Sequence, residues 1–453
     1  MRLGNSSTDE LPWEYKKQIR PVVQVSIAMI VIGFLEQISI TNPYTQVLIL
    51  RVFTVFIVLL ISSFFIGKTR HLINDLYHEK IYIVSSYFLW FLPFLSYRFS
   101  SEIWSGIFFL LMISLYLGKN SRRSITFLIG FVAAFSFLLR FQIGFALVGF
   151  LGWVFFVEKE TKQFFLKFIL SFAIVLVLGF FLDTWFYQVP TFSPLNYLIE
   201  FIATNNAQNY GISPWYFYFE RLLAIPTLLV GIPLLISLIV FFVKNPKNMF
   251  TWILLSFLFF HSIIGHKEVR FMFPMVYILP LVLSLIFFRY IGHYKHKIVI
   301  RVVFLLFFAC NFLLVILMSF KGMGRGRLVI AEYVYEYYNR KEIDVIYTSE
   351  SYLFQDPSGP LTMNFYKQPN LNLIQVNNPC EISSLIENTE RETLVVIELG
   401  DLKLDNCIDT HDALFLKESL PVKKEWISTL NALGFKIPKL DKMLLLYEFK
   451  SLQ

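Results

Sequence analysis

Residues 261–280 read HSIIGHKEVRFMFPMVYILP and place a dense cluster of charged side chains between two apolar runs. The cluster consists of His266, Lys267, Glu268 and Arg270. Ionisable groups at membrane depth are costly, so they usually face a cavity, a partner or a reacting group. The stretch therefore predicts a membrane protein with a functional site here. An internally paired cluster that only caps a helix is the structural alternative.

The composition also indicates a membrane protein. The 453 residues are 56% hydrophobic and only 16% charged, whereas soluble domains usually carry about 25% charged residues. The net charge of +8 comes mostly from short loops beside apolar runs, which is the pattern of topology signals rather than of a nucleic-acid-binding surface. We expect an integral, multi-pass protein whose partner is the membrane bilayer. We do not expect it to bind nucleic acid.

Eleven apolar segments are candidate helices, since about 20 apolar residues cross the hydrocarbon core of a bilayer. They are residues 22–40, 47–66, 81–97, 103–117, 125–139, 143–157, 164–182, 222–243, 249–264, 271–288 and 298–320. The first segment either spans the membrane or lies along its surface. We expect an all-α polytopic bundle of about 10–11 transmembrane helices over residues 1–320.

Basic residues in the loops orient these helices, because cytoplasmic loops carry an excess of Lys and Arg. The loops predicted to be cytoplasmic hold Lys68, Arg70 and Lys80; Lys119, Arg122 and Arg123; Lys159 and Lys162; Lys244 and Lys247; and Arg289, Lys295, Lys297 and Arg301. From residue 81 onward, the alternation places four polar elements on the opposite, non-cytoplasmic face: residues 98–102, 140–142, 183–221 and 266–270. We expect these elements to form one site.

The character of the chain changes after residue 320. Residues 321–453 hold dispersed charges and short β-prone runs at 345–347, 373–376 and 393–397, separated by turn signals. This pattern predicts a small soluble α/β domain on the non-cytoplasmic side. Cys380 and Cys407 are able to pair there if the compartment is oxidising.

Several blocks in residues 10–280 resemble one enzyme family, and they occur in the family's order. They are Trp13-Glu14-Tyr15 followed by Ile19-Arg20, Tyr97-Arg98-Phe99-Ser100-Ser101-Glu102, Asp183-Thr184-Trp185-Phe186-Tyr187, Pro194-Leu195-Asn196-Tyr197 with Asn205, Tyr210-Gly211-Ile212-Ser213-Pro214-Trp215-Tyr216-Phe217-Tyr218-Phe219, and His266-Lys267-Glu268-Val269-Arg270-Phe271 with Pro274. The chain thereby resembles glycosyltransferase family 22, the polyprenyl- or dolichyl-phosphate-mannose-dependent α-mannosyltransferases. The last two blocks are the most specific.

The resemblance implies a GT-C membrane fold and a mannosyltransferase activity. The donor would be mannose, or a related sugar, on a polyprenyl phosphate. The acceptor would be a glycan or glycolipid on the non-cytoplasmic face, and transfer would invert the anomeric centre. Such an enzyme would reside in the endoplasmic reticulum membrane or in a bacterial inner membrane.

One family element differs in this chain. Family members carry an acidic motif with the presumed catalytic base after their first transmembrane helix, upstream of the Trp-Glu-Tyr block. Here the acidic pair Asp9-Glu10 lies only three residues before Trp13, which is too close to be the same element. Either translation starts further upstream, or the chain is truncated, or Asp9 or Glu10 substitutes for the base.

Sugar transfer from a lipid phosphate requires a carboxylate to take the acceptor's proton and positive groups that face the leaving phosphate. Arginine offers phosphate a planar fork of donors, and lysine offers a point charge. Glu102 is a further carboxylate on the same face. The candidate catalytic residues are Glu268, His266 and Asp183, and the candidate substrate- and phosphate-binding residues are Lys267, Arg270, Arg98, Arg140, Tyr210 and Trp215.

Each candidate also has a structural interpretation. Asp183 is suited to cap a short helix. Arg98 and Arg140 are able to extend toward the membrane interface without a catalytic duty. The aromatic residues around Trp215 are typical of an interfacial belt.

The sequence predicts no cofactor other than the lipid-linked sugar donor. His261 and His266 do not have the i, i+4 spacing of a zinc-binding helix, so we predict no metal site and leave a requirement for a divalent metal open. Two rival functions remain. A transporter or lipid-glycan flippase would distribute its charges along the bundle and often contains inverted repeats. A non-catalytic relative would keep the fold without the base.

Overall fold

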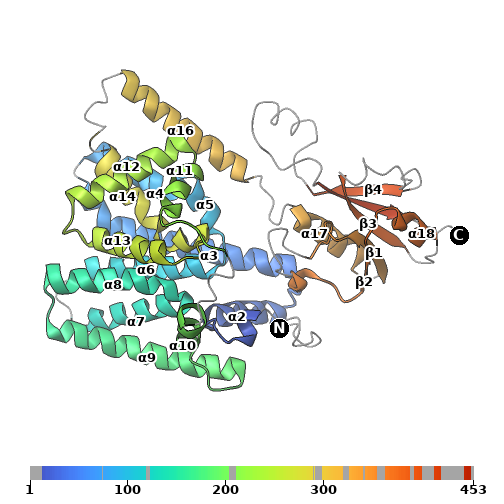
Figure 1. The fold of residues 1–453 in the computed structure, drawn as a ribbon, viewed down its shortest axis with the longest axis horizontal. Helices are drawn as coiled ribbons and strands as arrows, with labels where there is room; N and C mark the ends of the chain where they lie inside the picture. The colour runs from blue at the N-terminus through green and yellow to red at the C-terminus, as the bar shows by residue number, and fades with distance from the viewer. Residues whose placement is uncertain are drawn as a thin grey trace. The chain divides into compact units, whose positions relative to one another are not determined.

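The computed structural model describes residues 13–73, 75–118, 123–203, 211–288, 290, 298–319, 326–339, 342–354, 363–387, 392–399, 413–419 and 443–449. The chain divides into two compact units, which are considered separately (Figure 1). The helical unit comprises Leu3–Thr41 and Thr45–Ile316, and the second unit comprises mainly Leu317–Gln453.

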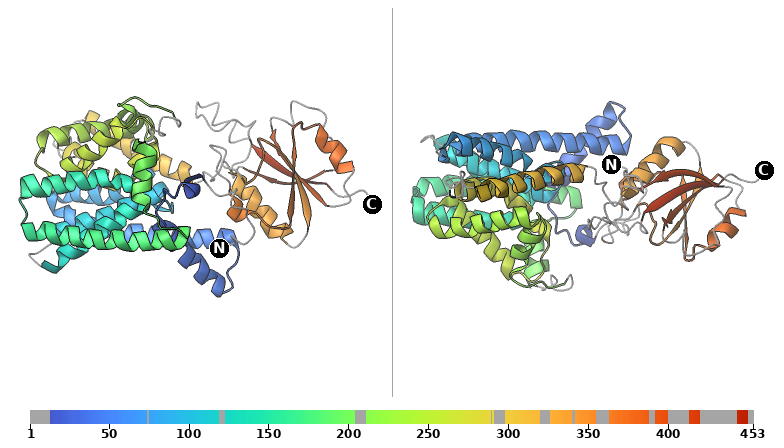
Figure 2. Two further views of the ribbon diagram at one scale, coloured as in Figure 1. Left: turned by 60° about the horizontal axis from the view of Figure 1, so that its bottom comes forward. Right: turned by 90° about the horizontal axis from the view of Figure 1, so that it is seen from above.

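The helical unit is built from α-helices joined by short 3-10 and π-helical turns. The α-helices are α1 (Trp13–Lys16), α2 (Val23–Gln37), α3 (Pro43–Thr69), α4 (Leu76–Phe88), α5 (Phe91–Ser96), α6 (Ser101–Leu117), α7 (Arg123–Leu139), α8 (Gly144–Trp153), α9 (Lys162–Tyr187), α10 (Ser193–Leu198), α11 (Phe217–Ala224), α12 (Leu228–Lys244), α13 (Met249–Ile263), α14 (Leu279–Leu283) and α16 (Ile298–Ser319). The shorter turns are η2 (Arg70–Leu72), η3 (Phe141–Ile143), η4 (Val154–Glu158), η5 (Ile199–Ala203), η7 (Val269–Ile278) and η8 (Ser284–Phe288). Helices α6, α7 and α9 lie side by side, as do α8 and α13 (Figures 1 and 2).

The multi-pass all-α bundle expected from the sequence is confirmed. Within the described residues, five helical segments are long and apolar enough to cross a membrane: Pro43–Leu72, Phe141–Glu158, Lys162–Tyr187, Val269–Phe287 and Arg301–Ser319. The helices α12 and α13 meet at a bend of 117° and make a sixth span if they are taken together. The described residues also contain three apolar helices that are shorter than these spans: Val23–Gln37, Ser101–Leu117 and Ile125–Leu139.

Some predicted segments are broken in the structure. The predicted helix 81–97 forms α4 and α5, with a break at Leu89 and Trp90. The side chain of Asn311 on α16 replaces the backbone bonds lost there, because its Oδ1 accepts from the Trp90 amide at 2.8 Å and its Nδ2 donates to the Phe88 carbonyl at 2.7 Å. Backbone groups inside a bilayer must be satisfied by protein, so the break depends on a side chain from a distant segment.

The predicted helix 271–288 begins instead as the 3-10 helix η7, and a glycine sets its position. A Cβ atom at Gly106 on α6 would lie 2.5 Å from the Pro274 Cα, so only glycine allows this close approach. Gly106 follows Glu102 by four residues, and Pro274 follows Arg270 by four. The contact between the two backbones therefore brings Glu102 and Arg270 near each other.

The second unit contains a five-stranded sheet in the order β2-β1-β3-β5-β4. Its strands are β1 (Ile343–Thr348), β2 (Leu371–Val376), β3 (Thr393–Glu398), β4 (Ala413–Glu418) and β5 (Leu444–Phe449), and its helices are α17 (Arg327–Tyr338) and α18 (Glu381–Glu387). Strand β1 pairs in parallel with β2 and β3, whereas β5 pairs antiparallel with β3 and β4. Ile330 and Val334 of α17 pack on one face of the sheet, and Ile382 of α18 packs on the other.

The α/β architecture expected after residue 320 is confirmed, and the three predicted β-runs lie in β1, β2 and β3. The sequence did not predict β4 and β5, because a short apolar run such as Leu444–Phe449 does not distinguish a strand from a helix.

Candidate active site

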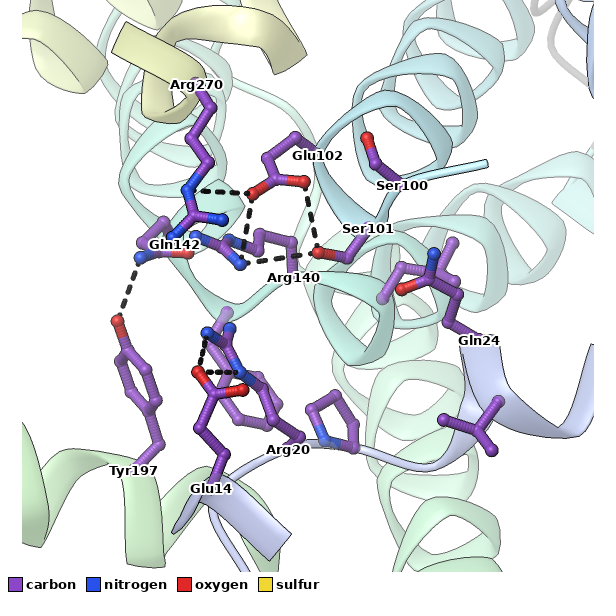
Figure 3. A pocket seen from close by; sticks show the side chains of 14 residues that line it. Glu14, Arg20, Gln24, Ser100, Ser101, Glu102, Arg140, Gln142, Tyr197 and Arg270 are labelled. Carbon is purple, nitrogen blue, oxygen red and sulfur yellow. Dashed lines mark hydrogen bonds and ion pairs between the residues drawn. The ribbon is translucent and has the colours of Figure 1, made fainter. Parts of the chain in front are cut away.

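A cavity of about 310 Å³ opens in the helical unit where several helices begin or end. It is lined by Glu14, Arg20, Pro21, Gln24, Val25, Ser100, Ser101, Glu102, Leu139, Arg140, Phe141, Gln142, Tyr197 and Arg270. These residues come from α1, the segment around the start of α2, the start of α6, the turn between α7 and α8, α10 and η7 (Figure 3). All four polar elements that the sequence places on one face contribute a side chain to this cavity.

The deepest part of the wall is an ion pair between Glu102 and Arg140. Their Oε1 and Nη1 atoms lie 3.3 Å apart, and their side chains are 7% and 5% exposed. Glu102 lies in the first turn of α6, where the helix dipole favours an anion. Arg140 follows the end of α7, donates to the Ser101 hydroxyl at 3.3 Å and covers the Phe271 ring. Buried charges need such partners.

Arg270 connects this wall to the charge cluster of the opening sequence stretch. Its Nε atom lies 3.9 Å from the Glu102 Oε1 atom, and its Nη2 donates to Glu268 Oε1 at 2.9 Å. Glu268 also lies 3.1 Å from the His266 Nε2 atom. Burial alone would raise the pKa of Glu268, but the contacts with Arg270 and His266 outweigh it and hold this pKa below its usual value. Glu268 is therefore an ionised partner of Arg270.

The opposite wall carries a second arginine–glutamate pair. Arg20 Nε donates to Glu14 Oε1 at 3.0 Å, and both side chains are about one third exposed. Burial acts to lower the pKa of Arg20, but the bond to Glu14 raises it overall. The Arg20 carbonyl accepts from the Tyr187 hydroxyl at 2.9 Å, which fixes this segment to the end of α9. Beside it, Gln142 Nε2 donates to the Tyr197 hydroxyl at 2.8 Å.

Some of the predicted site residues line the cavity, and others are connected to it through a lining residue. Arg140 and Arg270 line the cavity, and Glu268 and His266 reach it through Arg270. The other described candidates do not line it. Asp183 accepts from the Val22 amide at 2.9 Å and from the Ser193 hydroxyl, so it fixes the start of α2 to α9 and α10.

The remaining candidates are not among the lining residues or lie outside the described residues. Lys267 Nζ donates to the Ser213 carbonyl at 2.9 Å and to the Ile264 carbonyl at 2.5 Å. The Arg98 guanidinium lies 4.3 Å from the centroid of the Phe94 ring. Trp215 is 68% exposed, and Tyr210 lies outside the described residues, as do Asp9 and Glu10.

The lining residues that were not among the sequence candidates include Glu14, Arg20, Gln142 and Tyr197. Each lies in a block or polar element that the sequence singled out, so the signal was present at the level of segments. The lining carries three arginines and two glutamates, a surplus of one positive charge that suits an anionic ligand. Among the described residues, no group of three His, Cys, Asp or Glu side chains is placed to hold a metal ion.

The fold is that of solved GT-C glycosyltransferases. ArnT from Cupriavidus metallidurans bound to undecaprenyl phosphate superposes with a TM-score of 0.52 over 95% of this chain and 88% of its own, at 10% sequence identity. The same protein in the apo state gives a TM-score of 0.52 at 13% identity, over 95% of this chain and 87% of its own. The helical unit is thus a GT-C-type bundle, and the protein is an integral, multi-pass membrane protein.

The chain belongs to the Alg9-like mannosyltransferase family, whose sequence model matches residues 6–354. It is 34% identical to GPI mannosyltransferase 3 of Candida albicans over 128 residues, which are 28% of this chain and 24% of that protein. It is 30% identical to a probable Dol-P-Man:Man(7)GlcNAc(2)-PP-Dol alpha-1,6-mannosyltransferase of Schizosaccharomyces pombe over 103 residues, which are 22% of this chain and 18% of the relative. The matched stretches thus span less than a quarter of either relative.

Proposed function

We propose that the protein is a membrane mannosyltransferase that uses a polyprenyl-phosphate-linked sugar as donor and a glycan or glycolipid as acceptor. The observation that carries this proposal is the convergence of Arg20, Arg140 and Arg270 on one cavity from three distant segments. Arginine binds phosphate through parallel hydrogen bonds, and fixed cations stabilise the charge that develops on a leaving phosphate.

The cavity also suits the lipid part of such a donor. Pro21, Val25 and Leu139 provide apolar surface beside the arginines. Gln142 and Tyr197 provide neutral hydrogen-bonding groups suited to sugar hydroxyls. The fungal relatives are named as mannosyltransferases, one of them dolichyl-phosphate-mannose-dependent, and ArnT was solved with undecaprenyl phosphate. These names support a lipid phosphate donor here.

The distribution of basic residues supports a non-cytoplasmic site. The cavity lies where α6 begins and α7 ends, whereas the basic residues Lys162 and Lys244 lie at the start of α9 and the end of α12. Helix α9 runs from Lys162 to Tyr187, which is at the cavity side, so its basic end is remote from the cavity. Positive loops face the cytoplasm.

Cys380 is disulfide-bonded, which suits an oxidising compartment for the second unit.

The test is a donor-binding and transfer assay on the full chain in lipid nanodiscs. Labelled polyprenyl-phosphate-mannose is the donor, unlabelled polyprenyl phosphate is the competitor, and extracted glycolipids are the acceptors. We expect saturable donor binding that Arg140→Gln weakens and that Arg70→Gln leaves unchanged, because the Arg70 side chain is 59% exposed, pairs with Glu79 and does not line the cavity. Absence of both competition and transfer in the unmodified protein would refute the proposal.

A second candidate function is lipid-donor binding without transfer. Both lining carboxylates are paired with arginines, Glu14 with Arg20 and Glu102 with Arg140. An ion-paired carboxylate holds its proton weakly and is a poor base. The same assay separates the two functions, since a non-catalytic relative binds the donor and releases no mannosylated product with any acceptor.

A further inference from the structure

Two sequence blocks far apart in the chain are held together by a set of hydrogen bonds. The Ser213 amide donates to the Gly265 carbonyl at 3.0 Å, and Lys267 Nζ donates to the Ser213 carbonyl at 2.9 Å. The same Nζ atom donates to the Ile264 carbonyl at 2.5 Å. Together these bonds attach residues 211–214 to residues 264–267.

Lys267 is in an unusual environment for an ammonium group. The residue is only 7% exposed, and within the part of the chain that the structure describes, no carboxylate lies at ion-pair distance from it. Burial lowers the pKa of Lys267. A buried cation without a counterion is costly, and here two backbone carbonyls offset that cost. Its donors are therefore directed at backbone, whereas a phosphate ligand requires donors directed at the cavity.

His266 extends the connection to the cavity. Its Nδ1 atom lies 3.3 Å from the Gly211 carbonyl oxygen, and its Nε2 atom lies 3.1 Å from Glu268 Oε1. Both neighbours are hydrogen-bond acceptors, and each lies against one nitrogen of the ring. Glu268 in turn holds Arg270, whose Nε atom lies 3.9 Å from Glu102 in the cavity wall. A continuous chain of contacts thus runs from the 211–214 segment to the cavity.

From this geometry we propose that Lys267 is a positioning residue, which ties residues 211–214 to residues 264–267 and thereby sets the place of Arg270 at the cavity. The proposal rests on the proposed function for its activity readout. It differs from the role that the sequence suggests for Lys267, a point charge on the donor phosphate. The two roles give opposite results in a rescue experiment.

The experiment compares Lys267→Met with Lys267→Met combined with Ser213→Cys and Gly265→Cys. The Ser213 and Gly265 backbones are hydrogen-bonded. Among the described residues, a Cβ atom at Gly265 meets only the Ile212 side chain, at 3.8 Å or beyond, so a disulfide has room there to replace the tie. We expect Lys267→Met to lower kcat/KM by about 10- to 100-fold. The oxidised disulfide restores most of this loss, and reduction removes the restoration.

Three further measurements keep the result unambiguous. Lys267→Arg keeps its charge, so it retains activity if Lys267 binds phosphate and loses activity like Lys267→Met if Lys267 is a backbone tie in a tight site. Mass spectrometry verifies the crosslink. The unmodified protein is treated with the same reductant, because Cys380 is disulfide-bonded. Two results would overturn the proposal. The first is that Lys267→Met keeps its activity within about twofold of the unmodified protein. The second is that Lys267→Arg is fully active while the disulfide does not rescue Lys267→Met.

Amide hydrogen exchange separates failure of this inference from failure of the proposed function. The Ser213 amide is hydrogen-bonded to Gly265, so residues 211–216 exchange faster in Lys267→Met if the tie exists, whether or not the protein transfers mannose. Unchanged exchange in this segment overturns the tie. Faster exchange together with a complete lack of transfer in the unmodified protein refutes the proposed function and leaves the tie in place.

Discussion

Two arginine–glutamate pairs line the same cavity, and water reaches them to very different degrees. The Glu102 and Arg140 side chains are 7% and 5% exposed, whereas those of Glu14 and Arg20 are 30% and 31% exposed. A buried pair whose partner is removed leaves an uncompensated charge, while an exposed pair contributes little to stability. The cavity therefore has one rigid wall that the fold depends on and one wall whose arginine is able to leave its glutamate for a ligand.

The largest expected effect comes from breaking the buried pair. Glu102→Leu leaves Arg140 buried without its counterion, so we expect a loss of about 3–5 kcal/mol in the free energy of unfolding. The measurement is thermal unfolding of the purified protein in one detergent. The matched control is Glu102→Leu with Arg140→Met, which removes both charges and recovers most of the stability but not donor binding. A double variant as unstable as the single one would contradict the argument.

Gly106→Ala changes the buried wall without changing any charge. A Cβ atom there lies 2.5 Å from the Pro274 Cα and 2.6 Å from its carbonyl oxygen, so the backbone of η7 has to move. We expect a destabilisation of about 1–3 kcal/mol, together with a lower affinity for the donor because Arg270 moves away from Glu102. Gly33→Ala on α2 is the control, since no atom of the described residues lies within 4 Å of its Cβ position. Equal unfolding temperatures for the two variants would show that η7 adapts freely.

Arg20→Gln tests the exposed wall. We expect the free energy of unfolding to change by about 1 kcal/mol or less, while donor affinity falls by about 10- to 100-fold because a charge-assisted contact to phosphate is lost. Competition binding with polyprenyl phosphate measures the affinity, and thermal unfolding measures the stability. A stability loss as large as that of Glu102→Leu, without a change in affinity, would reverse the assignment of the two walls.

These contrasts also show which features of the protein are predictable from its sequence. Composition and apolar segments predicted the membrane bundle, and the ordered blocks predicted the family. The sequence did not predict the break between α4 and α5, because the group that satisfies the broken backbone is Asn311, more than 200 residues away. It did not predict the 3-10 form of η7 or its close approach to Gly106 either, since that approach is a contact between distant segments.

The sequence singled out the segments that line the candidate cavity, but not most of its individual lining residues. Charge in an apolar context shows that a side chain needs a partner, but it does not show which partner. Lys267 contacts backbone carbonyls and Asp183 contacts the start of α2, whereas Arg20 and Glu14 of the first block line the cavity. The direction of each side chain depends on backbone positions set by other segments, and those positions are not readable from one sequence.

The smallest expected effect concerns the third pair, Arg270 with Glu268, whose side chains are 48% and 33% exposed. The pKa of Glu268 is held below its ordinary value of 4.5. A lowered carboxylate pKa contributes stability above the unfolded-state value, and this stability is lost as the pH falls through the folded-state pKa. We expect the unmodified protein to exceed Glu268→Gln in stability by less than about 1 kcal/mol above pH 4.5.

Thermal unfolding of both proteins from neutral to acidic pH measures this difference. The two curves should converge as the pH falls below 4.5, because protonated Glu268 and glutamine then carry the same charge. A difference that persists in acid would show that Glu268 acts through packing and not through its charge. A difference as large as that expected for Glu102 would show that exposure does not separate the pairs, and the distinction between a rigid and an adjustable wall would fail with it.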